Sequence, residues 1–353
     1  MRDLLQEYDT LMATGEPVGR AVVTSVWGSA PRPEGACMLA TPTGRMAGSV
    51  SGGCVESAVA EEIRSAIARG TPRLVTFGVS DERAWEVGLA CGGTIKVLVQ
   101  PAVPSPVSVA ARGKGGVVVA TMLGPDGATL PAEPAVFREN ASIEHTGWPA
   151  WTLSLLQEPA RTALRQEASR SIELAGPDGS KAEVFLEVFP RRPRLVIFGG
   201  VHIAMALVPL AKTLGYYTVV ADGRQAFLTR ERFPEADELL VAWPEEAFRQ
   251  TGLDASCYVC LLSHDPKFDE PAMALALRSP AAYIGAIGSK KTQAARRERL
   301  KSQGFTETDI ARVHGPIGLD LGGRSPAETA LAIMAQVTAV RYGAPRWAVG
   351  RRP

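Results

Sequence analysis

The sequence predicts an α/β protein in which a mixed α/β N-terminal domain precedes a doubly wound domain built on a parallel sheet. In the second half, five short apolar runs alternate with segments of helical length, a pattern typical of a parallel sheet covered by helices on both faces. The first run ends in Gly199 and Gly200 and the second ends in Asp222, as in a βαβ nucleotide-binding unit. Two prolines and two arginines at 190–193 predict a linker, which divides the chain into domains 1–190 and 191–353.

The N-terminal domain is expected to open with an amphipathic helix over residues 1–15, which Gly15 ends. Glycine and proline crowd residues 28–35 and predict a loop, and three prolines over 101–106 predict a turn-rich connection. Two further helices are expected, one that ends at about Arg69 and one over 158–168. The expected strands are 20–27, 37–41, 45–50, 73–77, 94–100, 117–122 and 184–189.

The second domain carries clear signals for helix ends as well as for strands. Residues 306–309 and 325–328 each fit a capping box, in which a hydroxyl and a carboxylate satisfy the free backbone N–H groups of a helix start. Pro326 suits the first helical position, and the final helix is expected to run to about Tyr342. The expected strands are 195–198, 218–221, 238–242, 256–262 and 282–287.

The composition excludes several classes of protein. Hydrophobic residues make up 46% of the chain and charged residues 21%, the balance of a globular protein rather than of a disordered one. A net charge of +1 gives no overall attraction for nucleic acid. The apolar runs are too short to span a bilayer and the acidic N-terminus does not suit a signal peptide, so a cytoplasmic protein with no membrane span is expected. The five cysteines are expected to be thiols.

Glycines and polar residues follow the expected strands of the second domain, and ligands of open parallel sheets bind outside the carboxyl ends of the strands. Asp222 could accept both hydroxyls of a ribose or cap the next turn. His202 opens a helix, where it could contact an anion or have no ligand role. A metal site at His264, Asp265 and Asp269 is weakly indicated. The candidate rim residues are Gly199, Gly200, His202, Asp222, Arg224, His264, Asp265, Gly285, Gly288, Ser289 and Asp320.

The cysteines fall into two groups. Cys54 follows Gly52 and Gly53 at an expected helix start, where backbone amides and the helix dipole would favour a reactive thiolate. Cys91 precedes two glycines and a strand. Buried, unreactive thiols are expected for the others, Cys37, Cys257 and Cys260. The last two are spaced C-x-x-C within a strand, whose side chains alternate between faces, so they are not expected to bind one metal.

Several longer motifs occur in a fixed order: GSAPRPEGA at 28–36, GSVSGGCVE at 48–56, CGG at 91–93, FGGVHIA at 198–204 and VADGR at 220–224. They are followed by SHD at 263–265, YIGAIGSK at 283–290 and PIGLD at 316–320. With these motifs the chain resembles the XdhC/CoxI family, accessory proteins of molybdenum hydroxylases such as xanthine dehydrogenase, over nearly its whole length. The family turn is usually Gly-Ala-Gly-His, whereas this chain has Val201 at the third position.

The resemblance implies a Rossmann-like second domain and a non-catalytic chaperone. Such a protein binds the molybdenum cofactor (molybdopterin), protects it while it gains its sulfido ligand, and delivers it to the hydroxylase apo-enzyme. A cysteine desulfurase and that apo-enzyme are the implied partners, and a homodimer is implied as well. Cys54, alone or with Cys91, would contact the molybdenum or its ligands, because soft thiolates suit such a centre. The rim loops would hold the pterin or its phosphate; the candidate phosphate partners are Arg32, Arg224, Lys290 and Lys291.

Two other functions stay open at this point. The first is an NAD(P)-dependent oxidoreductase that uses the second domain. Val201 disfavours it, because a side chain at this position would crowd the path of a phosphate to the backbone, and the sequence offers no obvious base for hydride chemistry. The second is a redox or persulfide relay through Cys54, which would not require tight binding of a pterin.

Overall fold

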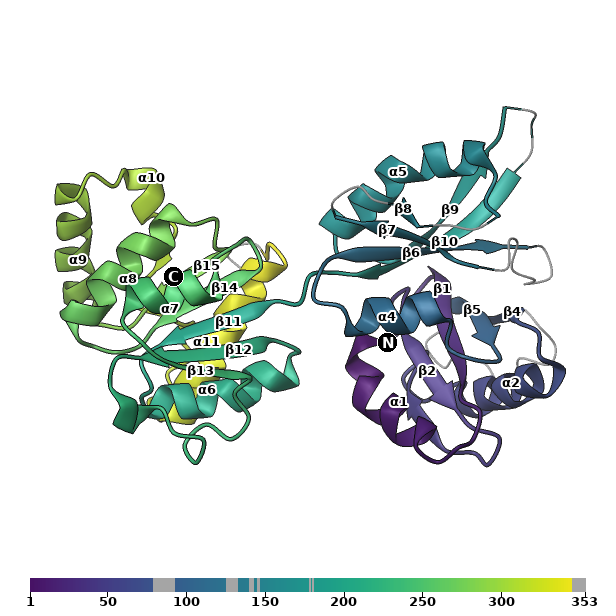
Figure 1. Ribbon diagram of the computed structural model, residues 1–353, viewed down its shortest axis with the longest axis horizontal. Coiled ribbons are helices and arrows are strands. Elements are labelled where there is room, and N and C mark those ends of the chain that lie inside the picture. Colours follow the sequence, from purple (N-terminus) through teal and green to yellow (C-terminus); the bar gives the residue numbers. More distant parts are fainter. Residues whose placement is uncertain are drawn as a thin grey trace. The chain divides into compact units, whose positions relative to one another are not determined.

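The computed structural model describes residues 1–78, 93–124, 133–139, 143–144, 147–177, 179 and 181–344 (Figure 1). The chain divides into two compact units, Met1–Arg191 and Arg192–Pro353. The division lies within the segment 190–193, for which the sequence predicts a linker. Among the described residues, no helix combines the length and the apolar character needed to cross a membrane.

The first unit contains a five-stranded antiparallel sheet whose two faces have different partners. Ala21 and Val23 pack with the helix α2 on one face, and Val22 and Leu98 lie in a different cluster. This division follows from the two-residue alternation of side chains along a strand. In spatial order the strands are β3 (Met46–Gly48), β2 (Cys37–Ala40), β1 (Gly19–Trp27), β5 (Thr94–Gln100) and β4 (Arg73–Phe77), and α2 spans Glu56–Arg69.

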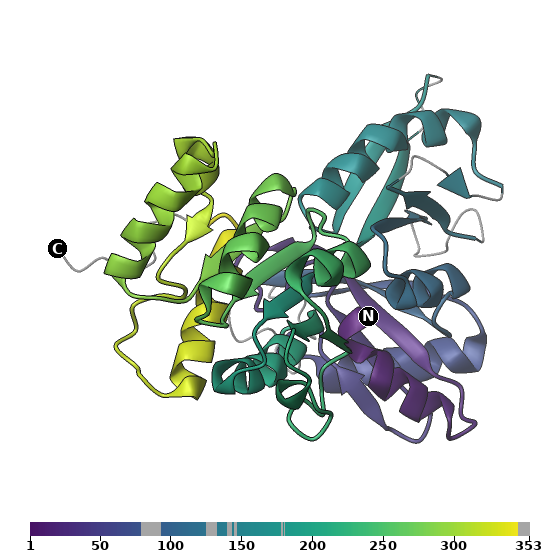
Figure 2. The same ribbon diagram turned by 60° about the vertical axis from the view of Figure 1, so that its left-hand side comes forward.

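A second antiparallel sheet completes the first unit. Val22 and Leu98 of the first sheet pack against Leu123 and Phe185 of the second. The helix α5 (Ala150–Arg165) runs along the other face of the second sheet, as both views show (Figure 1, Figure 2). Its strands in spatial order are β8 (Ile143–Glu144), β7 (Ala135–Arg138), β6 (Val117–Leu123), β10 (Lys181–Phe189) and β9 (Arg170–Ala175). The short helices η1 (Arg2–Leu4), α1 (Leu5–Met12) and α4 (Ser105–Arg112) contribute to a further core cluster.

Two predictions for this unit were wrong in part. The predicted turn-rich connection over 101–106 gives way to a helix, α4, from Ser105 onward. Pro104 is its N-cap and Pro106 lies in its first turn, where a backbone N–H has no intrahelical partner to lose. The helix predicted over 158–168 begins earlier, at Ala150, and contains Pro159. The strands β7, β8 and β9 were not predicted.

The second unit is the predicted parallel sheet with helices on both faces. Its strands in spatial order are β13 (Glu238–Val241), β12 (Tyr217–Asp222), β11 (Arg194–Phe198), β14 (Cys257–Leu261), β15 (Tyr283–Ala286) and β16 (Val313–His314). In chain order this is 3-2-1-4-5-6, the order of the dinucleotide-binding folds, with a topological switch point between β11 and β14. The two-residue β16 was not predicted, because it is too short to show a period.

The helices of the second unit divide between the two faces of the sheet (Figure 1). On one face lie α6 (His202–Thr213) and α11 (Pro326–Arg341). On the other lie α7 (Pro244–Thr251), α8 (Pro266–Arg278), α9 (Lys290–Ser302) and α10 (Glu307–Ile310). Cys260 packs in the first cluster and Cys257 in the second, so the C-x-x-C pair is split between faces as predicted. Both predicted capping boxes are present, at Thr306 and Ser325.

Candidate functional site

The first candidate feature is the loop that carries Cys54, between β3 and α2. Among the described cysteines Cys54 is exposed, whereas Cys37, Cys257 and Cys260 are buried. Gly52 and Gly53 have φ angles of +82° and +121°, conformations that side chains disfavour. Val55, which follows Cys54, is buried and anchors the loop. The loop therefore presents a thiol to solvent from a backbone that glycine makes accessible.

The carboxylate of Glu56, the first residue of α2, closes this loop from within. It accepts hydrogen bonds from the hydroxyls of Ser49 and Ser51, at 2.6 and 2.7 Å, and from the N–H groups of Ser51, Gly52 and Gly53, at 2.9, 3.1 and 2.8 Å. Burial raises the pKa of Glu56, but the hydrogen bonds from Ser49 and Ser51 outweigh it and bring the pKa to about 2. The backbone N–H groups that the sequence predicts to favour a thiolate at Cys54 thus donate hydrogen bonds to Glu56 instead.

Three of the sequence motifs meet around this loop. A Cβ atom on Gly93 would lie 2.7 Å from the carbonyl oxygen of Ser29, so the glycine that ends the CGG motif packs against the 28–35 loop. A Cβ atom on Gly52 would come within 3.8 Å of Pro31 in the same loop. The Nε of Arg32 is buried and has no hydrogen-bond partner among the described residues. Cys91 itself lies outside the described residues.

The second candidate feature is the glycine turn after β11. Gly199 has a φ of +113°, and a Cβ atom there would lie 2.7 Å from the backbone nitrogen of Ser263. A Cβ atom on Gly200 would lie 2.7 Å from the carbonyl oxygen of Phe227. Both glycines therefore allow close packing within the chain. Val201 is partly buried in the core, and α6 begins at His202 with no side-chain cap among the described residues.

Asp222, at the end of β12, is fully buried and fully engaged. Its carboxylate accepts hydrogen bonds from the Gly200 N–H at 2.9 Å, from the Arg224 N–H at 2.9 Å and from the Arg224 guanidinium at 2.9 and 2.8 Å. Burial raises the pKa of Asp222, but these hydrogen bonds outweigh it and hold the pKa below its usual range. The carboxylate thus links the glycine turn to the end of β12. Its lone pairs accept hydrogen bonds from Gly200 and Arg224, so they are not available to the hydroxyls of a ribose.

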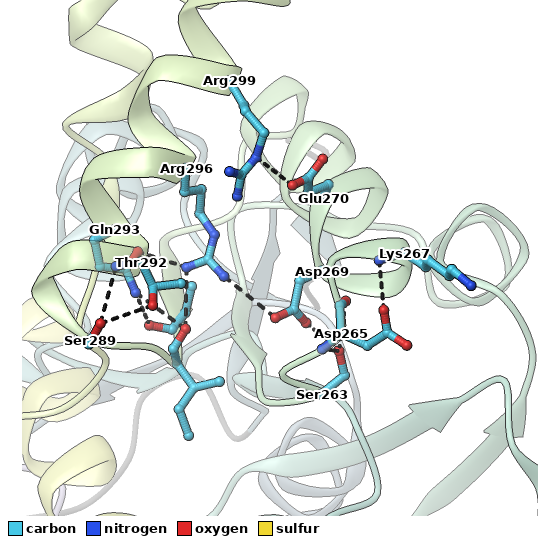
Figure 3. Close-up of polar contacts among 12 residues, drawn as sticks. Ser263, Asp265, Lys267, Asp269, Glu270, Ser289, Thr292, Gln293, Arg296 and Arg299 are labelled. Atoms are coloured by element: carbon cyan, nitrogen blue, oxygen red, sulfur yellow. Dashed lines mark hydrogen bonds and ion pairs between the residues drawn. The ribbon is translucent and has the colours of Figure 1, made fainter.

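On the other side of the switch point, a buried network joins the ends of β14 and β15 (Figure 3). Asp269 of α8 accepts a hydrogen bond of 2.6 Å from the Ser263 hydroxyl and faces Arg296 of α9 at 3.5 Å. Burial raises the pKa of Asp269, and it lowers the pKa of Arg296. The Nη1 atom of Arg296 donates to the carbonyl of Ile287 and to Gln293. The network therefore fixes α8 and α9 relative to each other.

The remaining predicted rim residues shape the loops or lie on the surface. Asp265 caps α8 through the Lys267 N–H at 3.0 Å, and Ser289 caps α9 through the Thr292 N–H at 3.2 Å. His264 is exposed with a φ of +60°. Among the described residues, no group of three or more His, Cys, Asp or Glu side chains could hold a metal ion, so the suggested site at His264, Asp265 and Asp269 was wrong. Gly285 is buried within β15, Gly288 precedes α9 with a φ of +133°, and Asp320 is exposed.

Some residues of these features were missed in the sequence. Glu56 was recognised only as part of a motif, because Ser49 and Ser51 lie seven and five residues before it, which is not the spacing of a capping box. Arg296 shows no such signal, because its role depends on the contact between α8 and α9. Phe227 and Phe268 pack against Arg224, and Trp243 packs against Phe268. These contacts have no sequence signal for the same reason, because segments far apart in the chain make them.

Comparison with known proteins places the chain in a family. Residues 11–78 match the XdhC and CoxI family, and residues 195–337 match the XdhC Rossmann domain. The chain belongs to the XdhC and CoxI family. The Cys54 loop lies within the first matched range, and the glycine turn after β11 lies within the second.

Relatives of this XdhC and CoxI family member align over most of its length. It is 26% identical over 340 residues to a Bacillus subtilis protein named as a probable xanthine dehydrogenase subunit, covering 94% of this chain and 96% of that protein. It is 25% identical over 345 residues to the molybdenum cofactor insertion chaperone PaoD of Escherichia coli, covering 96% and 88%. A crystal structure described as a xanthine dehydrogenase from Bacillus halodurans superposes with a TM-score of 0.76 at 26% identity, covering 98% and 97%.

Proposed function

We propose that this protein binds the molybdenum cofactor, supports its sulfuration and delivers it to a xanthine dehydrogenase-type molybdenum hydroxylase. The observation that carries the proposal is the exposed Cys54 thiol on a loop that Glu56 holds in place. A thiolate is a soft ligand that suits molybdenum, and a loop fixed before binding loses little conformational entropy when it binds. The likeness to PaoD, named as a molybdenum cofactor insertion chaperone, supports the choice of cargo.

The rim of the second unit is the proposed binding surface for the pterin and its phosphate. The amides at the start of α6 have no side-chain cap among the described residues, whereas α8 and α9 are capped by Asp265 and Ser289. Free N–H groups and the helix dipole favour an anion, so a phosphate suits the start of α6. Lys290 and Lys291 are exposed at the start of α9 and add positive charge at the same edge of the sheet, the edge formed by the carboxyl ends of its strands.

The partners follow from the cargo. A cysteine desulfurase would supply the sulfur for the sulfido ligand, and the hydroxylase apo-enzyme would receive the cofactor. We infer a homodimer as the working form. A protein that delivers the cofactor must also release it. Cys54 would therefore bind the molybdenum reversibly and would not act as a catalytic nucleophile.

A nicotinamide-dependent activity is less well supported. The strand order is that of a dinucleotide-binding fold, but the lone pairs of Asp222 are used by Gly200 and Arg224. A ribose would have to displace the Arg224 guanidinium from a buried carboxylate, which costs a charge-assisted hydrogen bond.

Co-expression with an active molybdenum cofactor pathway tests the proposal. The purified chain is expected to carry molybdenum and pterin, measured by mass spectrometry and by the fluorescence of the oxidised pterin. Cys54→Ser should lower the molybdenum content and the activation of an apo-hydroxylase. Cys260→Ala, which removes a buried thiol in the other unit, is the control and should leave both unchanged provided that circular dichroism shows a folded protein. Intact binding and activation in Cys54→Ser would overturn the role of this thiol.

A further inference from the structure

An aromatic surface lies at the carboxyl ends of β12, β13 and β14. Trp243, two residues after β13, is 54% exposed, and its ring lies 4.7 Å from that of Phe268 at an angle of 38°. The Arg224 guanidinium lies 3.9 Å from the centre of the Phe227 ring and 5.7 Å from that of Phe268. The Arg224 guanidinium thus packs against Phe227 and Phe268, and Trp243 packs against Phe268; Trp243 is the exposed ring of this aromatic surface, whereas Phe268, in α8, is only 7% exposed beneath it.

This surface is built into the rim by the backbone. The Ala242 N–H donates to the carbonyl of Asp222, which places Trp243 beside the end of β12. A Cβ atom on Gly223 would lie 2.9 Å from the Phe268 ring, so the absence of a side chain lets that ring reach the strand end. A Cβ atom on Gly200 would lie 2.7 Å from the carbonyl oxygen of Phe227, so the backbone of Phe227 lies against the glycine turn. The aromatic surface thus leads from the edge strand β13 to the glycine turn.

We propose that Trp243 and Arg224 form a stacking surface for the planar fused-ring heterocycle of a phosphorylated ligand. Among the aromatic side chains, Trp has the ring face that attracts polarised or cationic rings most strongly. The plane of a guanidinium group also stacks on heterocycles. The exposed ring of Trp243 would stack on such a heterocycle when the ligand binds. The ring of Phe268 packs against Trp243 and holds it in place.

The position of the surface fits a ligand with both a ring and a phosphate. Trp243 follows β13, and the uncapped start of α6 follows β11, so the two lie two strands apart. Neighbouring strands are about 4.8 Å apart, which gives a separation of roughly 10 Å. A bicyclic ring joined by a short chain to a phosphate spans about this distance. Both a phosphorylated pterin and a purine nucleotide have this chemistry; the choice of the pterin rests on the proposed function.

Binding to the full-length chain, measured by isothermal titration calorimetry, tests the surface. The ring-bearing probes, which carry a fused heterocycle, are neopterin monophosphate and AMP, and ribose 5-phosphate is the phosphorylated ligand without a fused heterocycle. Trp243→Ala is expected to weaken the binding of a ring-bearing probe by roughly 5- to 150-fold, the range for loss of one stacking contact. Its affinity for ribose 5-phosphate should be unchanged. Trp243→Phe should retain most of the binding, because it keeps a ring at the same position.

Val241→Ala is the matched control, because Val241 is 52% exposed on the same edge strand but is not aromatic. It should bind all probes as the unchanged protein does. Equal losses in Val241→Ala and Trp243→Ala would overturn the proposal. The proposal would also be overturned if Trp243→Ala bound the ring-bearing probes as tightly as the unchanged protein does. This holds as well if that variant changes from dimer to monomer, since Trp243 would then belong to a contact between copies. Failure of the unchanged protein to bind either ring-bearing probe would also overturn it.

The two probes with rings separate this inference from the proposed function. Preference for neopterin monophosphate supports both. Binding of AMP alone supports the stacking surface and contradicts the pterin assignment. Molybdenum and pterin that co-purify with the chain in the same amount in Trp243→Ala would support the proposed function while overturning the stacking surface.

Discussion

At the scale of single residues, the Cys54 loop depends on one carboxylate. Glu56 satisfies the N–H groups of Ser51, Gly52 and Gly53, groups that a chain of this shape would otherwise leave to water. An anion bound within a concave run of backbone amides is a recurrent device of protein loops. Here the anion belongs to the chain, so the loop needs no ligand to keep its shape, and the neighbouring thiol is presented in the free protein.

Replacement of Glu56 should destabilise the first unit. Glu56→Gln removes the charge from several hydrogen bonds, and we expect a loss of about 1–2 kcal/mol in the free energy of unfolding, measured with urea at pH 7. Glu61→Gln is the control, because Glu61 forms an exposed pair with Arg64 on the same helix and should change stability by less than about 0.5 kcal/mol. Equal effects of the two substitutions would contradict the role given to Glu56.

The contribution of Glu56 should also depend on pH. Its pKa in the folded protein is about 2, below the value of roughly 4.3 expected in the unfolded chain. A lowered pKa stabilises the fold above the unfolded-state value, and that stabilisation is lost as the pH falls toward the folded-state value. The difference in unfolding free energy between the unchanged protein and Glu56→Gln should therefore be constant above about pH 5 and shrink between about pH 4 and pH 2. A difference that grows on acidification would contradict this.

The exposure of the thiols gives a third prediction at this scale. Brief treatment of the native protein with iodoacetamide should modify Cys54, while Cys37, Cys257 and Cys260 should react only after unfolding in urea. Peptide mass spectrometry with and without urea measures each site. Cys54→Ser should lose the modification of that peptide and leave the protection of the three buried thiols unchanged. Native labelling of Cys260 as fast as that of Cys54 would contradict the assigned burial.

At the scale of elements, the sequence predicted the second unit far better than the first. The strands β11, β12, β14 and β15 are buried in a parallel sheet and read as continuous apolar runs, which is a strong local signal. The strands β8 and β16 have two residues each, too few to show any period. The helix α4 was hidden by its prolines, because proline marks both a turn and the first turn of a helix.

The candidate site was predictable to the same limited extent. Positions at strand ends, such as Gly199 and Asp222, follow from the pattern of the sequence, and they do lie at one edge of the sheet. The partners of these residues do not follow from it. The pairing of Asp222 with Arg224, and the approach of Phe268 to Gly223, depend on how separate loops pack.

The two sheets of the first unit are joined by a buried ion pair between β1 and β10. Arg20 and Glu187 are 1% and 5% exposed, and Arg20 also donates to Gln100 at 3.1 Å. Glu187→Ala would leave a buried guanidinium without its counter-charge, and we expect a loss of about 3–5 kcal/mol in the free energy of unfolding. Glu183→Ala, on the same strand in a more exposed pair with Lys96, should cost about 0–1 kcal/mol. Urea unfolding of both variants decides whether burial sets the cost.

At the scale of the whole molecule, the apolar cores follow the division of the chain. Among the described residues, each core cluster draws all its members from one side of 190–193. A unit that encloses its own core can fold alone. The exposed thiol and the aromatic surface thus belong to separately stabilised bodies, and a substitution in one core should leave the binding surface of the other intact.

Expression of residues 192–353 alone should therefore give a folded protein. We expect a helical circular dichroism spectrum and a cooperative urea transition, because the sheet from β13 to β16 and both of its helical layers are retained. A matched fragment that begins at Tyr216 lacks β11, one of the two central strands, and α6, which covers one face of the sheet, and should not fold. An unfolded 192–353 fragment would show that this core depends on the first unit. A folded one would allow the binding of the ring-bearing probes to be measured without Cys54, which separates the role of the rim from that of the thiol.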